Sequence, residues 1–472
     1  MELKAALKQY FGYSSFKTGQ EETIQSVMAG KDTLSILPTG TGKSLCYQLP
    51  SYLLPPGLTV IVSPLISLMY DQVQQIHQRG EKRVVALNSQ LSYHEKQWIL
   101  QHLSSYRYLF LSPEMILQPQ VLATLKKLPL ALFVVDEAHC ISQWGIDFRP
   151  EYRQLGQVRK ELQNPVTLAL TATATPLVEA DIQHILFADQ PIHTIRLSVN
   201  RPNIHYQVVE TSHKDEAIEQ FILDYQGPGI VYFSSKKKAE QMASALQAKG
   251  IAAAAYHGGL DTIDRGKIQQ QFLNHQLEIL CATTAFGMGV NKPDIRYVIH
   301  YHLPASLEAF VQESGRAGRD GNPALSLLFY QEGDEYLQRL LAADTVDEFQ
   351  QLTQVMKKQP QLLKERPELL NERQQKWYQQ LIQHPDSEQA MGQAIEQHQQ
   401  AKEKQLSSML DYVQTKADRR AVILQYFGES TQGEVKGEKE DWSFLQKRTE
   451  KKQPMIEEKS YVAKIKQLFN QP

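Results

Sequence analysis

The chain has 472 residues, with 50 Lys and Arg against 52 Asp and Glu, and three cysteines. At about 150 residues per domain, this length predicts roughly three domains. The net charge of −2 excludes a uniformly basic nucleic-acid coat protein, but not an enzyme that gathers positive groups in one cleft. We find no signal-peptide pattern and no apolar run approaching the ~18 residues of a membrane span. Three widely spaced cysteines are typical of a reducing, cytoplasmic protein, and they exclude a four-cysteine zinc site.

Short apolar runs alternate with amphipathic stretches over the first two-thirds of the chain. Each run is rich in Val, Ile, Leu or Phe and is followed by a turn or a helix start, which is typical of buried parallel strands in βαβ units. The first series of expected strands is 33–37, 59–62, 106–111, 130–135 and 166–170.

A second series of apolar runs begins near residue 204, after the turn-favouring sequence SVNRPN at 198–203. We place a boundary in that turn and predict two α/β domains, residues 1–199 and 200–335. The second series of expected strands is 204–209, 229–233, 251–256, 277–282, 297–301 and 325–330.

The strand signal ends near residue 335, and residues 336–472 form the third predicted region. Residues 350–400 contain fifteen glutamines, so this stretch is expected to be helical or partly disordered rather than sheet. Residues 402–426 have the apolar spacing of an amphipathic helix pair, and residues 461–469 that of a short helix.

A candidate phosphate-binding loop follows the first expected strand. The chain has Leu37 where the P-loop pattern has its first glycine, and the rest of the pattern is intact. Glycines allow backbone N–H groups to surround a phosphate, a lysine neutralises its oxygens, and a serine hydroxyl binds Mg²⁺. A glycine-rich strand-to-helix turn is the alternative, but the order of strand, loop and helix favours a nucleotide site. The candidate residues are Thr39, Gly40, Thr41, Gly42, Lys43 and Ser44.

A tetrapeptide with two acidic residues, DEAH at 136–139, follows the expected strand 130–135. Active sites of parallel sheets lie at the carboxyl ends of their strands. We expect Asp136 and Ser44 to hold Mg²⁺, and Glu137 to orient or deprotonate the attacking water. His139 has two interpretations, a structural hydrogen bond or a role in coupling.

Further motifs follow one another in a specific order. They are FGYSSFKTGQ at 11–20, SPLISL at 63–68, DEAHCISQWG at 136–145 with DFRP at 147–150, TATAT at 171–175, AFGMGVNKP at 285–293 and QESGRAGRDG at 312–321. Together they resemble superfamily 2 helicases, and within them the RecQ family, over about residues 5–335. DRR at 418–420 and YFGE at 426–429 extend a weaker resemblance. The resemblance implies two tandem RecA-like parallel-sheet domains followed by a mostly helical C-terminal region.

The resemblance also implies an adenine-reading motif in residues 11–20. The Gln20 amide would contact adenine N6 and N7, and Tyr13 and Lys17 would stack on the ring. The family has Arg at the position of Lys17, so the stacking is expected to be weaker here. For Tyr13, a packed core aromatic is the alternative.

Arg316 and Arg319 are expected to share one face of a helix, with Gln312 beside them. By resemblance, Arg319 is an arginine finger that reaches from the second lobe to the γ-phosphate and makes hydrolysis depend on lobe closure. The alternative is a solvated basic helix face.

Contacts with DNA are expected from two sets of residues. By resemblance, the aromatic-rich loop after the acidic motif stacks on unpaired bases through Trp144, Phe148 and Arg149. Ile146 replaces the usual family His, and a hydrophobic plug between the lobes is the alternative. The second set holds small polar residues and a histidine at strand ends or turns, which suit a DNA backbone and are also common as caps. These are Ser63, Thr171, Asn203, Ser234, His257 and Thr283.

The region after the second lobe departs from the RecQ pattern, which usually includes a four-cysteine zinc site. Asp418 occupies the first cysteine position, and Lys436, Lys439 and Trp442 align with the others. Because lysine cannot replace a thiolate as a zinc ligand at neutral pH, we expect no zinc and a helical hairpin held by apolar packing and charge pairs. The last 44 residues are too few for a winged-helix domain, which we expect to be missing.

The motifs together predict an ATP- and Mg²⁺-dependent DNA helicase that moves 3′→5′ by family analogy. Its expected setting is recombination and repair in a bacterial cytoplasm, at the nucleoid, with single-stranded and forked DNA as substrates. Single-strand-binding or recombination proteins are the expected partners. The alternatives are an RNA-directed enzyme of the same superfamily, an inactive scaffold, and a translocase or remodeller that does not separate strands.

Overall fold

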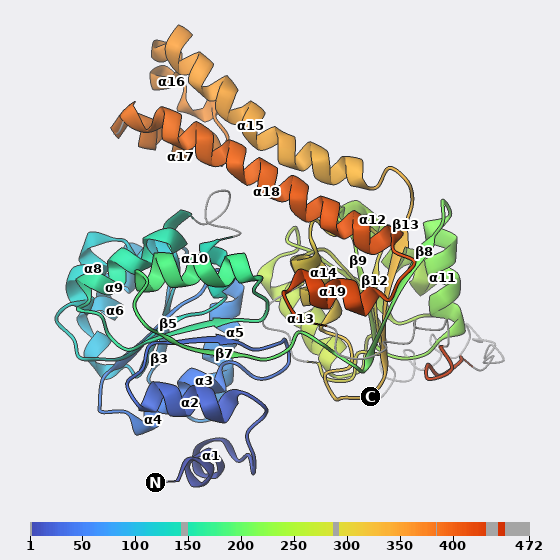
Figure 1. Ribbon diagram of the computed structural model, residues 1–472, viewed down its shortest axis with the longest axis horizontal. Helices are drawn as coiled ribbons and strands as arrows, with labels where there is room; N and C mark the ends of the chain where they lie inside the picture. Colours follow the sequence, from blue (N-terminus) through green and yellow to red (C-terminus); the bar gives the residue numbers. More distant parts are fainter. Residues whose placement is uncertain (1, 143–149, 287–291, 384, 431–441, 449–472) are drawn as a thin grey trace, which may run out of the picture.

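The computed structural model describes residues 2–142, 150–286, 292–383, 385–430 and 442–448. Two α/β lobes lie side by side, and a helical arm extends from the second lobe (Figure 1). The first lobe contains α1 (Leu3–Phe11), α2 (Gln20–Met28), β1 (Thr33–Ile36), α3 (Leu45–Gln48), α4 (Pro50–Leu53), β2 (Leu58–Val62), α5 (Ile66–Gln78), β3 (Val84–Leu87), α6 (Tyr93–Gln101), η1 (Leu103–Ser105), β4 (Tyr108–Leu111), α7 (Pro113–Ile116), α8 (Pro119–Leu125), β5 (Leu130–Val135), η2 (Ala138–Ile141), η3 (Pro150–Gln154), α9 (Leu155–Glu161), β6 (Thr167–Thr171), α10 (Pro176–Phe187) and β7 (His193–Arg196).

The second lobe follows the first in the chain, and the C-terminal region follows the second lobe. The lobe contains β8 (Ile204–Glu210), α11 (Lys214–Asp224), β9 (Gly229–Tyr232), α12 (Lys236–Ala248), β10 (Ala253–Tyr256), α13 (Thr262–Leu273), β11 (Ile279–Ala282), β12 (Tyr297–His300), α14 (Leu307–Ser314) and β13 (Ala324–Tyr330). The C-terminal region contains α15 (Glu335–Lys358), α16 (Pro360–Glu365), η4 (Pro367–Leu369), α17 (Glu372–Gln383), η5 (Pro385–Ser387), α18 (Glu388–Gln414) and α19 (Arg419–Tyr426).

Each lobe is built on one parallel sheet. The strand order is β3-β4-β2-β5-β6-β1-β7 in the first lobe and β10-β11-β9-β12-β13-β8 in the second. Every pairing between these strands is parallel, so the carboxyl ends of the strands in a sheet lie along one edge. The expected fold of two RecA-like lobes and a helical C-terminal region is confirmed. The proposed boundary at 199/200 falls in the connection between β7 and β8.

Apolar residues cover both faces of each sheet, and this explains the continuous apolar runs in the sequence. On β2, Val60 and Val62 enter one core cluster and Ile61 enters another on the opposite face. The predicted strands are present, with ends shifted by up to two residues. The sequence analysis missed β3 and β7, because these edge strands are short and β7 carries polar, partly exposed residues.

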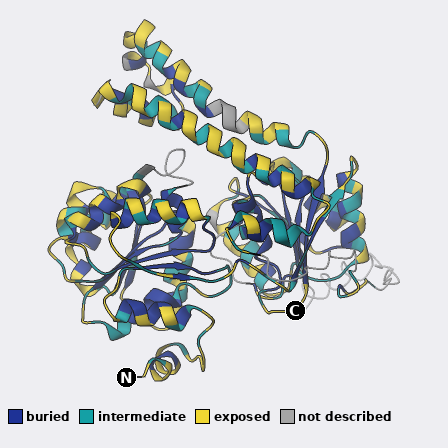
Figure 2. Ribbon diagram, in the orientation of Figure 1, coloured by how far each residue is buried: buried dark blue, intermediate teal, exposed yellow. Residues whose placement is uncertain are grey.

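The glutamine-rich stretch forms an arm of α15 and α18, which run side by side, with α16 and α17 at the far end (Figure 1). Figure 2 shows that most of the arm is exposed or partly buried. One small apolar core holds its far end together, made of Phe349, Leu352, Leu363, Leu370, Trp377, Leu381 and Ile395. The helical expectation for this stretch is therefore correct. No helix in the described part of the chain combines the length and apolar character needed to cross a membrane.

The C-terminal region is anchored on the second lobe. The end of α18 and helix α19 bury Met409, Tyr412, Ile423 and Phe427 in the core of that lobe, as the predicted amphipathic pair requires. Farther along, Trp442 packs edge-on against Phe221 and Tyr225, and its indole N–H donates to Gln207 Oε1 at 2.5 Å.

Residues 442–448 add further apolar and polar contacts between the C-terminal region and the second lobe. Phe444 stacks on His205, and Leu445 is buried in the second core cluster of the lobe. Arg448 pairs with Glu278 at 2.7 Å and donates to the carbonyl oxygen of Ile222. This packing and this charge pair hold residues 442–448 on the second lobe. Residues 431–441 are outside the described part, and the zinc-free hairpin held by packing and charge pairs stays a prediction.

We expect Trp442→Ala to weaken this anchor because the substitution removes a packed indole and its hydrogen bond. The local free energy of opening at β8 and α11 should fall by about 2 kcal/mol, less than the cost of truncating a fully buried Trp, because Trp442 is partly buried. Hydrogen exchange of their amides measures it. The matched control is Trp98→Ala, whose side chain is 55% exposed on α6 and should change stability by less than about 0.5 kcal/mol. Equal exchange in both variants would contradict the anchor.

Candidate active site between the two lobes

The phosphate-binding loop connects β1 to α3 at the carboxyl edge of the first sheet. Gly40 and Gly42 have φ values of +86° and +75°, a conformation that L side chains rarely adopt. Leu37, which replaces the first glycine of the pattern, is fully buried and donates its N–H to the Thr171 carbonyl oxygen at 2.9 Å. The departure from the pattern therefore faces the core and leaves the loop itself intact.

The residues predicted to read adenine hold this loop from the side. The Gln20 amide donates to the carbonyl oxygens of Thr41 at 2.7 Å and Gly42 at 3.1 Å, and it accepts from the Lys17 N–H at 2.8 Å. Lys17 Nζ donates to Gly40 O at 2.8 Å. Tyr13 lines the same cavity and is 50% exposed, so it is not a core aromatic. Base recognition by Gln20 stays a prediction, and it requires the amide to exchange a loop carbonyl for the base.

The acidic motif lies next to the loop, at the end of β5. Burial and the neighbouring Glu137 carboxylate raise the pKa of Asp136 to about 7, and the Lys43 ammonium opposes this shift. Glu137 has a φ of +49°, an uncommon value for a residue with a side chain. Its Oε2 is buried without a hydrogen bond among the described residues. A buried carboxylate pair beside Lys43 and Ser44 fits a magnesium-bound phosphate chain.

His139 connects the acidic motif to the TATAT segment. Its Nδ1 lies 2.9 Å from Thr171 Oγ1 and 3.4 Å from Glu137 Oε2. The Thr171 hydroxyl in turn donates to Thr173 O at 2.9 Å. Burial lowers the pKa of His139, which favours a neutral ring. The structural hydrogen bond considered for His139 is present, and a coupling role would act through the same bond.

The second lobe supplies arginines to the same cavity. Helix α14 carries Gln312 and ends at Ser314, so Arg316 and Arg319 lie in the turn that follows and not on one helix face as predicted. Arg316 is buried, and desolvation together with the nearby Arg316 and Arg201 charges lowers the pKa of Arg319 to about 9. The solvated basic face is thereby ruled out for Arg316.

Two contacts join this turn to the phosphate-binding loop across the lobe boundary. Thr39 Oγ1 donates to Gly315 O at 2.9 Å. A β-carbon placed on Gly40 would lie 3.1 Å from Arg319 Cγ, so the arginine chain rests against the loop backbone. The two halves of the predicted site are therefore in direct contact.

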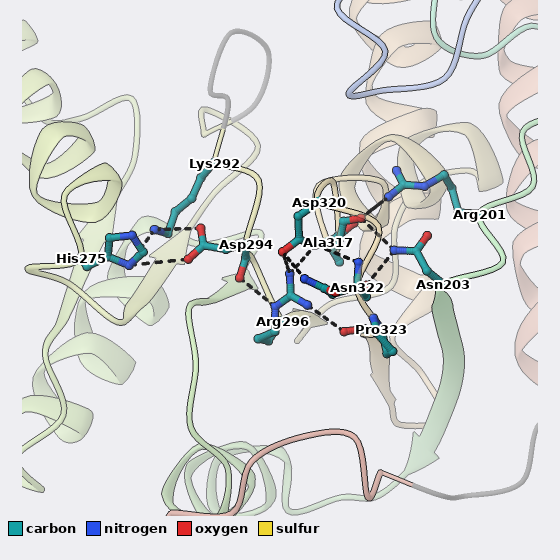
Figure 3. Close-up of polar contacts among 11 residues, drawn as sticks. Arg201, Asn203, His275, Lys292, Asp294, Arg296, Ala317, Asp320, Asn322 and Pro323 are labelled. Atoms are coloured by element: carbon teal, nitrogen blue, oxygen red, sulfur yellow. Dashed lines mark hydrogen bonds and ion pairs between the residues drawn. The ribbon is translucent and has the colours of Figure 1, made fainter. Parts of the chain in front are cut away.

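We call the turn at residues 315–320, which carries Arg316 and Arg319, the arginine turn. The side chain of Arg201, a residue that the sequence motifs did not single out, binds backbone carbonyl oxygens of this turn (Figure 3). Its guanidinium donates to the carbonyl oxygens of Gly315, Ala317 and Gly318 at 3.2, 3.1 and 2.8 Å. Asn203 Nδ2 also donates to Gly318 O, at 2.8 Å, and to Asn322 O at 2.9 Å. Asn203 was expected to contact DNA, and here both of its amide hydrogens bind the turn.

A second group of polar contacts supports the other side of the turn (Figure 3). Arg296 binds both carboxylate oxygens of Asp320 at 2.7 Å and donates to Pro323 O at 3.0 Å. The Arg296 guanidinium helps to hold the pKa of Asp320 below its usual value. Nearby, the buried Lys292 pairs with Asp294 at 3.1 Å. The bonds of Arg296 hold the turn next to the start of β12.

The two lobes enclose a cavity of about 320 Å³. Nearly all predicted nucleotide and catalytic residues line it, and Thr41 contributes its carbonyl oxygen to the adjoining network. The sequence analysis missed several lining residues from α3, α5 and their neighbours, because they belong to no phosphate motif. These are Ser15, Leu45, Tyr47, Leu68, Gln72, Gln75 and Arg79.

The residues expected to contact DNA are not gathered in this cavity. Ser63 and Thr171 are buried, and His257 binds Glu240 at 2.8 Å and accepts from Gly259 N–H. Ser234 is exposed and Thr283 is partly buried, both at strand ends of the second lobe. Trp144, Phe148 and Arg149 lie outside the described residues.

The donor set of the C-terminal region does not fit a zinc site. All three cysteines of the chain are buried in the two lobes, at positions 46, 140 and 281. The described residues contain no group of three His, Cys, Asp or Glu side chains that could hold a metal. Lys436 and Lys439 fall outside those residues. The absence of zinc stays a prediction.

Comparisons with known families cover most of the chain. The DEAD/DEAH box helicase family matches residues 17–180, and the helicase conserved C-terminal domain family matches residues 213–321. The RecQ zinc-binding family matches residues 369–438, the region without cysteines.

The chain is similar to several curated helicases. It is 51% identical over 364 residues to the probable ATP-dependent DNA helicase RecS of Bacillus subtilis (strain 168). The aligned region covers 76% of this chain and 73% of that protein. It is 37% identical over 433 residues to the ATP-dependent DNA helicase RecQ of Haemophilus influenzae, covering 91% of this chain and 61% of that protein. With the Pasteurella multocida RecQ, the match spans 52% of the relative. The chain thus matches only about half to three-quarters of the length of these relatives.

Solved structures show the same fold at low identity. Mycobacterium smegmatis helicase Lhr, bound to ssDNA and AMP-PNP, has a TM-score of 0.57 and 20% identity over 72% of this chain and 49% of that one. The DUF1998 helicase MrfA bound to DNA has a TM-score of 0.61 and 18% identity over 71% and 52% of the two chains. At this identity the likeness concerns the arrangement of the two lobes.

We predict that the purified protein contains no tightly bound zinc, because the region aligned with the zinc module has no thiolate. Metal analysis by mass spectrometry should find far less than one zinc per chain, and chelators should leave the unfolding transition unchanged. About one equivalent of zinc that survives dialysis would contradict this prediction.

We also predict that Gly315→Ala separates the two halves of the site. A β-carbon there would lie 2.3 Å from Thr39 Oγ1 and 2.9 Å from Val311 O, so the arginine turn must move away from the loop. The rate of ATP hydrolysis should fall at least about tenfold, the equivalent of ~1.4 kcal/mol in the barrier, while nucleotide still binds the first lobe. The matched control is Gly266→Ala on α13, where no neighbouring atom lies within 4 Å. Equal rates in both variants would contradict a closed site.

Proposed function

The chain belongs to the RecQ family of ATP-dependent DNA helicases, and from this premise we propose that it couples ATP hydrolysis to 3′→5′ movement on single-stranded DNA and to unwinding of forked duplexes. The observation that carries the proposal is the hydrogen bond from Thr39 to the Gly315 carbonyl oxygen, which joins the phosphate-binding loop of one lobe to the arginine turn of the other. A site divided in this way is complete only when the lobes are closed.

Each side of the cavity has its own part in hydrolysis. The Lys43 ammonium and the loop N–H groups would bind the phosphate chain of ATP, and Ser44 and Asp136 would hold Mg²⁺, which neutralises charge on the phosphates when bound. Glu137 lies beside them with an Oε2 that accepts no hydrogen bond from the described residues, and it would orient and deprotonate the attacking water.

The arginine turn would stabilise the charge that develops on the γ-phosphate. Arg319 already lies against Gly40, so its guanidinium can reach the phosphates without a rearrangement of the turn. Arg316 and Gln312 line the same wall of the cavity. Because these side chains belong to the second lobe, opening of the cleft removes them from ATP, and this links hydrolysis to lobe movement.

Single-stranded DNA would bind along exposed strand ends of the second lobe. Ser234 is exposed just before α12, where free backbone N–H groups and the helix dipole favour a phosphate. Thr283 follows β11 on the same edge of the sheet. Thr171, Asn203 and His257 bind other protein groups, so we assign them a supporting role. Ser63 is buried, and its Oγ makes no hydrogen bond with the described residues. Trp144, Phe148 and Arg149 remain the proposed base-stacking residues.

The proposed setting is recombination and repair in the cytoplasm, at the nucleoid, with single-strand-binding or recombination proteins as partners. The near-neutral net charge of −2 gives the molecule little general affinity for nucleic acid. We therefore propose that binding depends on local contacts, and on partners that bring the enzyme to forked DNA.

Unwinding of forked duplexes with either a 3′ or a 5′ single-stranded tail tests the proposal. We expect ATP-dependent strand separation only with the 3′ tail. Glu137→Gln should bind ATP and DNA but hydrolyse ATP about 100-fold or more slowly, because it lacks the general base. ATPase rates with single-stranded DNA and with RNA are compared in parallel.

Each alternative function has its own outcome in these assays. DNA-stimulated hydrolysis without strand separation would indicate a translocase. Greater stimulation by RNA would indicate an RNA-directed enzyme, and no hydrolysis with either nucleic acid would indicate a scaffold.

A further inference from the structure

The connection between the two lobes is covered by one short C-terminal segment. Strand β7 of the first lobe ends at Arg196 and β8 of the second begins at Ile204, so the connection is residues 197–203. We call residues 418–429, which contain α19, the hinge clamp. They lie along this connection and bind it from one side through the contacts below.

Arg420 at the start of the hinge clamp binds the end of the connection nearer the second lobe. Its guanidinium donates to the carbonyl oxygens of Arg201 at 2.7 Å and Ile204 at 2.6 Å, and to Asn200 Oδ1 at 2.9 Å. It also lies 5.3 Å from the ring centroid of Tyr206 on β8. Two contacts to backbone carbonyl oxygens and one to the Asn200 side chain hold the connection at its end nearer the second lobe.

Glu429 at the end of the hinge clamp binds the connection nearer the first lobe. Its carboxylate accepts from the Val199 N–H at 2.8 Å and from the Ser198 hydroxyl. The adjacent Phe427 carbonyl oxygen accepts from Arg196 Nη1 at 3.1 Å. Gly428, with a φ of +74°, lies so close to α10 that a β-carbon would be 2.7 Å from Pro176 Cγ.

The connection and the hinge clamp also hold the arginine turn. The backbone carbonyl oxygen of Arg201 accepts from Arg420, and its side chain donates to the Gly315, Ala317 and Gly318 carbonyl oxygens. Figure 3 shows the Arg201 side chain beside Ala317. At the other end of α14, the Tyr426 hydroxyl donates to Glu308 Oε1 at 2.7 Å. The helix that leads to Arg316 and Arg319 is therefore fixed at both ends by residues that touch the connection or belong to the hinge clamp.

The two sides of the hinge clamp differ in the kind of contact they make. Toward the second lobe it buries an apolar face, with Ile423, Leu424 and Phe427 in the core of that lobe, besides the polar contacts of Arg420 and Tyr426. Toward the first lobe the described contacts are the bonds of Glu429 and of the Phe427 carbonyl oxygen, plus the approach to Pro176. A buried apolar face is retained during a lobe rotation more readily than a few polar bonds, so the hinge clamp would move with the second lobe.

We propose that the hinge clamp sets the closed position of the lobes and thereby positions Arg319 for ATP hydrolysis, with Arg420 and Glu429 as positioning residues. This inference rests on the proposed function, because it assigns the clamp a role in the same hydrolysis step. Neither residue lines the nucleotide cavity. Arg420 would act through Arg201 and the arginine turn, and Glu429 would act through Ser198 and Val199 of the connection.

The test compares Glu429→Ala with Glu429→Gln and with Gln425→Ala, a matched control at an exposed position of α19. In Glu429→Ala, kcat for DNA-stimulated ATP hydrolysis should fall at least about tenfold, because the change removes two charge-assisted hydrogen bonds, from Val199 N–H and from the Ser198 hydroxyl. KM for ATP and the affinity for a fluorescent ADP should stay the same, because the first lobe is untouched. Glu429→Gln should recover most of kcat, since its amide oxygen still accepts from Val199.

A second substitution, at the hydrogen-bond partner Ser198, separates the effect of this bond from a general loss of stability. Ser198→Ala added to Glu429→Ala should reduce kcat by less than the two single changes combined, because both remove the bond between Ser198 and Glu429. The bond from Asn200 N–H to Ser198 Oγ is lost only with the Ser198 change. Full kcat in Glu429→Ala, or a loss of kcat that only follows a loss of folded protein, would overturn the inference. A wild-type protein that hydrolyses no ATP with DNA would instead overturn the proposed function, and this inference with it.

Discussion

The contact between the phosphate-binding loop and the arginine turn is the constraint on which the rest of the site depends. Thr39 reaches the Gly315 carbonyl oxygen, and the Arg319 side chain rests on Gly40. Both contacts exist only because glycine leaves room for them on each side. The carboxyl edges of two separate parallel sheets must therefore face each other closely, and the elements around the hinge serve to hold them there.

Three arginines, Arg201, Arg316 and Arg319, lie close together in a partly desolvated place, where like charges repel. The structure offsets this cost locally, since Arg201 donates to three backbone carbonyl oxygens and the acidic motif lies across the cavity. A chain with almost no net charge thus creates a strongly positive wall where an anionic substrate would bind. The net charge of the whole molecule says little about such a site.

The C-terminal region shows how a helical appendage can be attached to a lobe through side-chain packing. The end of α18 and helix α19 bury an apolar face, Trp442 packs on α11, and Arg448 pairs with Glu278. These contacts come from residues far apart in the chain. The same packing fixes α19 along the connection between the lobes, so attachment and hinge geometry share one set of side chains.

The sequence by itself determined the parts of this protein that depend on short-range pattern. Apolar runs located the central strands, and the order of motifs located Lys43, Glu137 and Arg319, because both signals are local. Only the tertiary structure decided which groups meet. Thr39 and Gly315 are 276 positions apart, Asn203 binds the arginine turn, and Arg201 belongs to no motif. Such contacts depend on how two sheets and a C-terminal helix pack together, and no local spacing along the chain records that packing.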